Sequence, residues 1–223
     1  PQEWIISTRG KMLYRNSDIV DIKMFQGNMQ SWKLPPVGQH INFMTYARYF
    51  IPSFVSEDIV LYLDCDLVVT RDLTELFSID LTDKPLAAAK VIYGLEDRFN
   101  AGVLLINNAY WKENSIQQKL IDITESEHEH LLEADQTVLN IVIGKNYVLL
   151  DDVYNFQIGY DQVADNREQY FIFDIPLSPL PAIIHYLSAD KPWKTYSVGR
   201  LREVWWQYNQ LEWAQINSQE ELI

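Results

Sequence analysis

Two aspartates separated by one residue, Asp64 and Asp66, are the residues whose type and spacing most clearly suggest chemistry. They lie in the segment IVLYLDCDLVV, residues 59–69, in which apolar residues stand on both sides of the pair. Such a segment predicts a buried strand, and side chains two residues apart on a strand point to the same side. Because a buried charge is unfavourable unless it is compensated, the pair predicts a site for a divalent cation. Open α/β sheets bind ligands at the carboxyl ends of their strands, which agrees with this interpretation.

The charge balance restricts the partners that the chain can have. The net charge is −13, since 31 acidic residues outnumber 18 basic ones. This argues against a nucleic acid or an anionic membrane as partner, because both are bound through basic patches. An anionic small substrate stays compatible, since a metal ion and a few basic side chains can neutralise it locally.

The sequence has no feature that predicts secretion or membrane insertion. No apolar run approaches the length of a membrane span, and no signal-peptide pattern opens the chain. The single cysteine, Cys65, excludes an intrachain disulfide and fits a reducing compartment. We therefore expect a cytoplasmic protein with no stable membrane insertion.

Predicted strands alternate with predicted helices, which indicates an α/β sheet. Strands are expected at residues 18–24, 58–69, 86–91, 100–107, 147–151 and 182–187, and helices at residues 2–20, 42–50, 110–124, 134–143 and 201–213. A loop is expected at residues 27–38 and a short helical turn at residues 73–77. The helix at 42–50 should stop before Pro52, and Gly144 should end the helix at 134–143. The strand at 100–107 begins with small residues, so backbone or ligand can approach closely there.

Four further segments accompany the two aspartates in a fixed order. They are TYAR at residues 45–48, FNAGVLLIN at 99–107, ADQTVLN at 134–140 and HYLSADKPW at 185–193. Together with DCD at 64–66, this set resembles glycosyltransferase family 8 over roughly residues 41–193. The resemblance implies a metal-dependent, retaining transferase that uses UDP-sugars. It also implies an α/β fold of the GT-A type, a Rossmann-like mixed sheet flanked by helices.

The resemblance implies which residues bind the metal ion and the diphosphate. It implies that Asp64, Asp66 and His185 bind Mn²⁺ or Mg²⁺ and that Lys191 and the backbone around Ser188 hold the phosphates. Two carboxylates and an imidazole suit these ions. On its own, a histidine after an apolar strand, such as His185, is more often a core residue with satisfied hydrogen bonds.

The resemblance also implies a donor-sugar pocket. Arg48 would lie near the pyrophosphate or the sugar, with Asn100 and Ala101 beside the sugar. Asp135 and Gln136 are the catalytic candidates, with Gln136 near the anomeric carbon. Without the resemblance, Arg48 could form a surface ion pair, and Asp135 could be a helix N-terminal carboxylate favoured by the helix dipole.

Cys65 is expected to pack, with only its backbone near the nucleotide. Three departures from the family pattern accompany these assignments. Nothing before residue 41 matches the family segment that holds uracil and ribose, Val91 stands where the family has an aspartate, and Ser188 replaces a glycine. We therefore expect a transferase domain at residues 1–195 that lacks its first nucleotide-binding strand. An aromatic helical tail at 196–223 follows it and is a candidate homodimer contact.

The predicted function is transfer of glucose or galactose from a UDP-sugar to a glycan or glycoprotein acceptor. One alternative is a truncated or degenerate domain that binds metal and nucleotide without turnover. A phosphatase of the haloacid dehalogenase type also has an Asp-x-Asp pair after an apolar strand. It requires a small residue and a threonine after the second aspartate, whereas this chain has Leu67 and Val68.

Overall fold

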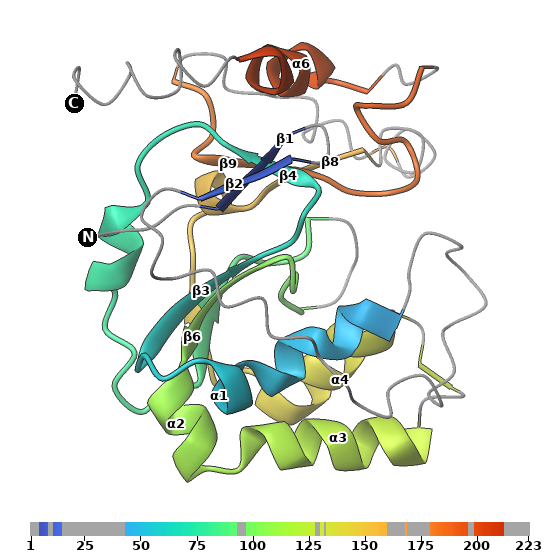
Figure 1. The fold of residues 1–223 in the computed structure, drawn as a ribbon. Helices are drawn as coiled ribbons and strands as arrows, with labels where there is room; N and C mark the ends of the chain where they lie inside the picture. The colour runs from blue at the N-terminus through green and yellow to red at the C-terminus, as the bar shows by residue number, and fades with distance from the viewer. Residues whose placement is uncertain are drawn as a thin grey trace.

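Two mixed sheets lie between a group of helices on one side and helix α6 (Arg202–Gln210) on the other (Figure 1). The computed structural model describes residues 5–8, 11–14, 43–92, 97–127, 130–131, 133–159, 168, 179–195 and 199–211. This arrangement confirms the predicted mixed α/β fold flanked by helices. None of the helices in these ranges combines the length and the hydrophobicity that crossing a bilayer requires.

The first sheet has four strands. In their order across the sheet they are β3 (Ile59–Leu63), β6 (Val103–Asn107), β5 (Leu86–Ala88) and β7 (Val148–Leu149). β6 is antiparallel to both β3 and β5, whereas β5 and β7 are parallel. Both faces are covered, because Leu104 and Ile106 pack into one apolar cluster while Val103 and Leu105 pack into another. This two-sided burial explains why residues 103–106 of β6 are all apolar.

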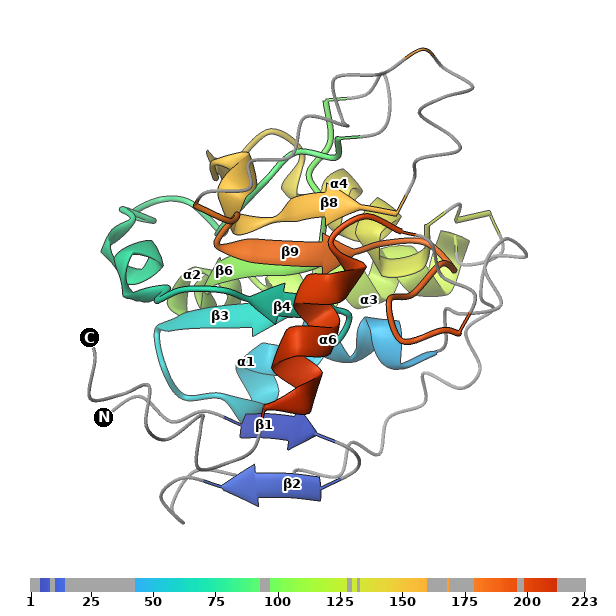
Figure 2. The same ribbon diagram turned by 90° about the horizontal axis from the view of Figure 1, so that it is seen from above.

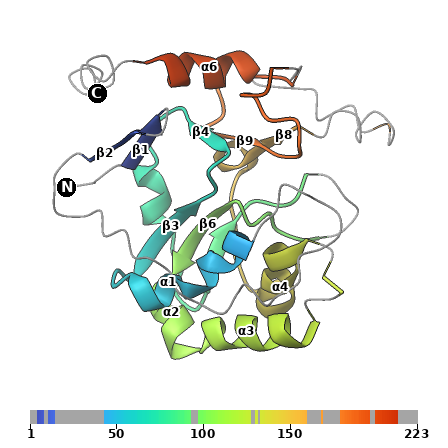
Figure 3. The same cartoon turned by 45° about the vertical axis from the view of Figure 1, so that its right-hand side comes forward.

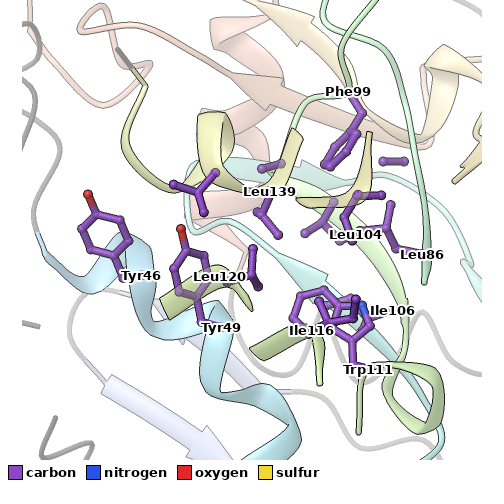
Figure 4. Close-up of a cluster of buried hydrophobic side chains, with 14 of the residues drawn as sticks. Tyr46, Tyr49, Leu86, Phe99, Leu104, Ile106, Trp111, Ile116, Leu120 and Leu139 are labelled. Atoms are coloured by element: carbon purple, nitrogen blue, oxygen red, sulfur yellow. The ribbon is translucent and has the colours of Figure 1, made fainter. Parts of the chain in front are cut away.

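Helices cover one face of the first sheet. They are η2 (Phe43–Phe50), α1 (Ile51–Phe54), α2 (Asn108–Glu113), α3 (Ile116–Glu127) and α4 (Ala134–Ile143). Figure 4 shows their contributions to the core: Tyr46 and Tyr49 from η2, Trp111 from α2, Leu120 from α3 and Leu139 from α4. All five are fully buried. This packing fixes η2 and α4, which carry part of the candidate site.

The second sheet lies on the other face of the first and has three strands. Their order is β4 (Leu67–Val69), β9 (Ile183–Tyr186) and β8 (Phe156–Ile158), with β9 antiparallel to β4 and parallel to β8. Ile183 packs toward the first sheet, whereas Ile184 packs outward against Val204 of α6 (Arg202–Gln210). Figure 2 shows α6 lying across this sheet. Two short helices, η3 (Thr74–Ser78) and η4 (Asp152–Tyr154), complete the described elements of this region.

The N-terminal prediction is wrong where the structure describes it. Residues predicted as helix form an antiparallel pair, β1 (Ile5–Thr8) and β2 (Lys11–Tyr14), drawn in dark blue in Figure 3. The β-branched residues of β1 favour a strand over a helix. The strand predicted at 18–24 and the loop at 27–38 lie outside the described residues.

Several element boundaries also differ from the predictions. The helix predicted at 110–124 is two helices, α2 and α3, separated at Ser115, whose φ is 54°. The helical run that begins at Phe43 continues past Pro52, because this proline lies in the first turn of α1, where its missing N–H is not needed. α4 has the predicted bounds, and β8 is a strand that the sequence analysis did not identify. The strand predicted at 58–69 is two strands, β3 and β4, in different sheets.

Candidate functional site

Asp64, Asp66 and His185 converge where the two sheets meet. Asp64 follows β3, Asp66 precedes β4, and His185 in β9 is paired in register with Leu67 of β4. One ligand atom from each of the three side chains lies within 4.8 Å of the others. Nε2 of His185 is 3.2 Å from Oδ1 of Asp66 and 3.8 Å from Oδ2 of Asp64. The structure thus brings the three predicted metal ligands together.

The convergence has a different cause from the one predicted. Residues 64–66 form a bend, so strand alternation does not place the two carboxylates on the same side. The backbone N–H of Asp64 donates to the carbonyl of Gly102 over 2.8 Å, which ties it to the first sheet. The carbonyl of Asp66 accepts from the N–H of Tyr186 over 2.9 Å, which ties it to the second. The chain changes sheet within the motif, and this change brings both carboxylates to His185.

Gly102 leaves the space that this convergence needs. A Cβ at this position would lie 2.0 Å from Cε1 of His185 and 2.9 Å from Oδ2 of Asp64. The sequence analysis predicted a close approach at the small residues that begin this segment, and the structure identifies the imidazole of His185 as the approaching group.

The chemistry of the three side chains fits a divalent cation. His185 is 1% exposed, and its Nε2 is buried without a hydrogen-bond partner while it faces two carboxylates. Burial alone would raise the pKa of Asp66, but the positive charge of Lys191 beside it helps to hold this pKa well below its ordinary value. An orphaned imidazole nitrogen beside an ionised carboxylate is a donor set that suits Mn²⁺ or Mg²⁺.

Arg48 is buried beside the cluster of Asp64, Asp66 and His185. Its guanidinium donates to Oδ1 of Asp64 over 2.9 Å and to the carbonyl of Ala101, and its Nε lies 2.9 Å from Oδ2 of Asp135. It also lies over the ring of Tyr62, 4.4 Å from the ring centroid. Because Arg48 is only 6% exposed, the alternative interpretation as a surface ion pair is wrong.

Asp135 lies in the first turn of α4 and is 4% exposed. The hydroxyl of Thr45 donates to its Oδ1, while Arg48 lies against its Oδ2. Burial raises the pKa of Asp135 to about 6, although Arg48 acts in the opposite direction. Arg48 and Asp135, which the sequence suggested separately, thus form a direct ion pair.

Gln136 and Asn100 are hydrogen-bonded to each other. Oε1 of Gln136 accepts from Nδ2 of Asn100 over 3.2 Å and from the N–H of Ala101 over 3.0 Å. Its Nε2 donates to Glu133 over 3.1 Å, and Glu133 in turn pairs with Arg98 at 2.6 Å. The structure therefore also brings the predicted donor-pocket residues together.

Lys191 and its loop are held over the second sheet. Nζ of Lys191 donates to Asp66 and to the carbonyl of Tyr186. The next carbonyl, that of Pro192, accepts from Nε of Arg202 over 2.8 Å and from Nε1 of Trp206 over 3.0 Å. Helix α6 thereby anchors the loop that carries Lys191.

Ser188 and Cys65 complete the predicted set. Ser188 has a φ of 65°, a conformation that glycine adopts without strain, and its hydroxyl donates to the carbonyl of Gly159 over 2.7 Å. Cys65 is exposed, so the expectation that it packs is wrong, because residues 64–66 bend between two sheets rather than continue a buried strand.

Val91 follows β5, where the family resemblance would place an aspartate. Asp97 does not replace that aspartate, because it forms surface ion pairs with Lys90 at 2.6 Å and with Lys145 at 3.3 Å. Neither position 91 nor Asp97 thus supplies the site with the carboxylate that the family pattern places here.

The sequence analysis missed Asn155, which follows η4 and is 1% exposed. Its Oδ1 lies 2.9 Å from Nδ1 of His185. An asparagine beside an unidentified strand gives no recognisable signal in a single sequence. Tyr62, whose hydroxyl donates to Asp64 over 2.7 Å, was missed because it reads as one more apolar strand residue.

The chain is similar in sequence to known glycosyltransferases. The sequence profile described as glycosyl transferase family 8 matches residues 6–197. Glycosyltransferase GlyE of Streptococcus pneumoniae serotype 4 is 54% identical over 219 residues, which cover 97% of this chain and 53% of GlyE. Glycosyltransferase GlyA of the same organism is 40% identical over 100% of this chain and 31% of GlyA. The chain thus spans about half the length of GlyE and about a third of GlyA.

Solved structures give the same result. The crystal structure of GlyE from Streptococcus pneumoniae TIGR4 has a TM-score of 0.73 and 60% identity, covering 77% of this chain and 44% of GlyE. The structure of the galactosyltransferase LgtC with donor and acceptor sugar analogs has a TM-score of 0.63 and 26% identity, covering 79% of this chain and 69% of LgtC. The profile match begins at residue 6, well before residue 41, where the sequence analysis began its resemblance.

Proposed function

Because the chain belongs to glycosyl transferase family 8 and has the GT-A fold, we propose that it transfers a hexose from a UDP-sugar to a glycan or glycoprotein acceptor in a metal-dependent reaction. The observation that carries the proposal is the cluster of Asp64, Asp66 and His185 where the two sheets meet. In this cluster, Nε2 of His185 is buried and has no hydrogen-bond partner. These three side chains would hold Mn²⁺ or Mg²⁺. When bound, such a cation supplies Lewis-acid stabilisation of the charge that develops on the leaving diphosphate.

Lys191 would act on the same negative charge, the one that develops on the leaving diphosphate. Lys191 carries an ammonium group with three donors, of which one is on Asp66 and one on the carbonyl of Tyr186. A third donor is therefore available to a phosphate oxygen next to the cluster. Placing fixed positive charge where negative charge grows is an effective way to lower the barrier of such a reaction. The anchoring of Pro192 by α6 keeps Lys191 in place for this role.

The donor sugar would occupy the pocket that Arg48, Asn100, Asp135 and Gln136 border. Asp135 and Arg48 offer an acceptor and a donor for sugar hydroxyls, and their mutual pairing fixes both orientations. Gln136 has its side chain fixed by Ala101 and Glu133, so it is pre-organised rather than mobile. As cation-like character develops at the anomeric carbon, the carboxylate of Asp135 and the carbonyl oxygen of Gln136 would stabilise it.

Glucose and galactose are the proposed donor sugars. The similarity to LgtC, which is named a galactosyltransferase, supports a hexose. Val91 removes a carboxylate that the family pattern places beside the donor hydroxyls, so the choice between the two sugars would depend on the other pocket residues. The alternative of a binding domain without turnover rests on this same substitution and on the absence, before residue 41, of a match to the family segment that holds uracil and ribose.

The test is release of UDP from a panel of UDP-sugars in the presence of Mn²⁺, with EDTA as the control. Asp66→Asn should reduce UDP release and Mn²⁺-dependent UDP binding by at least about 100-fold, since it removes a charged ligand. Asp80→Asn is the matched control, because Asp80 is an exposed aspartate that only accepts from the N–H of Thr82. UDP binding without turnover would support the binding-domain alternative, and metal-independent UDP binding would contradict the metal assignment.

A further inference from the structure

An unbroken series of side-chain hydrogen bonds connects the donor pocket to the metal cluster. Gln136 accepts from Asn100, Asn100 accepts from Nδ2 of Asn155 over 2.9 Å, and Oδ1 of Asn155 lies 2.9 Å from Nδ1 of His185. Asn100, Asn155 and His185 are 5%, 1% and 1% exposed, so water does not compete for these bonds. The series belongs to the interior of the protein and brings four side chains from distant segments together.

Two backbone N–H groups determine the direction of every bond in the series. The N–H of Gly102 donates to Asn100 over 2.9 Å, so the atom of Asn100 at that point must be its oxygen. The N–H of Ala101 fixes the oxygen of Gln136 in the same way. Because the oxygen of Asn100 accepts, the atom of Asn155 that faces it must be the amide nitrogen. The oxygen of Asn155 therefore faces His185.

The tautomer of His185 follows from this order. An amide oxygen is only an acceptor, so Nδ1 of His185 must carry the hydrogen in this bond. In the neutral ring Nε2 then has no hydrogen, and its lone pair faces Asp64 and Asp66. The opposite tautomer would direct an N–H at Asp66 and leave no lone pair for a cation.

We propose that Asn155 is a positioning residue that holds His185 as the Nδ1–H tautomer, so that Nε2 is ready to ligate the divalent cation. Outer hydrogen-bond partners of this kind orient metal-binding histidines and raise their basicity. This inference rests on the proposed function only for the identity of the cation. The tautomer itself is a property of the metal-free protein.

The first test is ¹⁵N NMR of the histidine side chains in the metal-free chain, at a pH where the rings are neutral. The chain has four histidines, and His185→Gln identifies the signals of His185 by their loss. We expect a protonated Nδ1 and an unprotonated Nε2 for His185. In Asn155→Leu the ring should change to the Nε2–H tautomer, because Asp66 is then its nearest acceptor. Asn155→Asp loses the bond to Asn100 but should keep the original tautomer, since a carboxylate also accepts from Nδ1–H.

The second test is the affinity for Mn²⁺ alone, measured by calorimetry. Asn155→Leu should weaken it by about 10- to 100-fold, the range found for outer hydrogen-bond partners of metal ligands. Asn155→Asp should restore much of the affinity. Asn108→Leu is the matched control, because Asn108 is equally buried but donates only to the carbonyls of Val55 and Glu57. It should destabilise folding and leave the affinity of the folded protein unchanged.

The outcomes separate this inference from the proposed function. An Nε2–H tautomer in the wild type, or an unchanged tautomer in Asn155→Leu, would overturn the role of Asn155. If Asn155→Leu does not fold, the wild-type spectrum and Asn155→Asp still decide the question. A chain with the expected tautomer and Mn²⁺ affinity but no activity on UDP-sugars would contradict the proposed function and leave the role of Asn155 intact.

Discussion

Replacing Gly102 by alanine should disable the metal cluster without touching a ligand. The added Cβ would lie 2.0 Å from Cε1 and 2.7 Å from Nδ1 of His185. Ordinary van der Waals contact begins at 3.4 Å, so the imidazole would have to move by roughly 1.4 Å. His185 cannot move freely, because it lies in β9 between two paired strands and is hydrogen-bonded to Asn155.

Two magnitudes follow from this geometry. Overpacking a rigid interior costs about 1–3 kcal/mol of unfolding free energy. A displaced ligand should also weaken Mn²⁺ binding, by at least the roughly 10- to 100-fold that misaligned histidine ligands lose. The second effect should exceed what the loss of stability explains, since the clash lies within the cluster itself.

Calorimetric titration of Mn²⁺ and urea denaturation of the metal-free chain measure the two effects separately. Gly144→Ala is the control, because Gly144 has a φ of 57° and nothing lies within 4 Å of an added Cβ. Its backbone strain should cost a similar 1–3 kcal/mol, about as much as the clash, while Mn²⁺ affinity is kept. A variant that combines Gly102→Ala with His185→Ala should be more stable than the sum of the single effects predicts, since the clashing ring is gone.

Wild-type Mn²⁺ affinity in Gly102→Ala would refute this reasoning, since it would mean that the imidazole tolerates the Cβ. Equal losses of affinity in Gly102→Ala and Gly144→Ala would also refute it, because the effect would then be global. Additivity in the double variant would show that the ring and the Cβ do not meet.

Three further predictions concern charge, anchoring and metal removal. Burial raises the pKa of Asp135 from 3.8 to about 6, so the folded chain binds this proton more tightly than the unfolded one. The unfolding free energy should therefore fall as pH rises through this interval, by on the order of 3 kcal/mol. Urea denaturation measured across the same pH range should show no such fall in Asp135→Asn. Trp206→Phe keeps a ring but loses the bond to the carbonyl of Pro192. In calorimetry with Mn²⁺, the variant should bind UDP about five-fold more weakly, the equivalent of one hydrogen bond. Unchanged affinity would show that the bond from Arg202 to the same carbonyl is enough to anchor the loop. Mn²⁺ at about 100 times its Kd should stabilise the chain by about 2.7 kcal/mol, and EDTA should reverse the rise in Tm.

The sequence predicted which residues lie together at the candidate site better than it predicted the bounds of the elements that carry them. Asp64, Asp66 and His185 could be identified because their types and order match a family pattern, and types are visible in a sequence. The change of sheet between β3 and β4 was not visible, because apolar residues continue on both sides of the bend. Periodicity reports burial, and both strands are packed against apolar neighbours, so the two-strand arrangement and a single strand have the same pattern.

Other features were missed because they depend on tertiary contacts. Asn155 acquires its role from a contact with His185, 30 positions away. The break between α2 and α3 at Ser115 was missed because no glycine or proline marks it in the sequence. In contrast, α4 was predicted with its bounds because Gly144 supplies a standard end signal.

The bend at residues 64–66 also makes the cluster a bridge between two parts of the architecture. Asp64 is tied to the first sheet, whereas Asp66 and His185 belong to the second. A cation held by all three would act as a cross-link between two units that otherwise adhere at this seam through apolar contacts and a few hydrogen bonds, such as that between Asn155 and Asn100. Amide hydrogen exchange in β9 and β6 should then report a single opening event in the loaded protein and separate events in the metal-free one. The motif that performs the chemistry would thus also determine whether the two sheets open together.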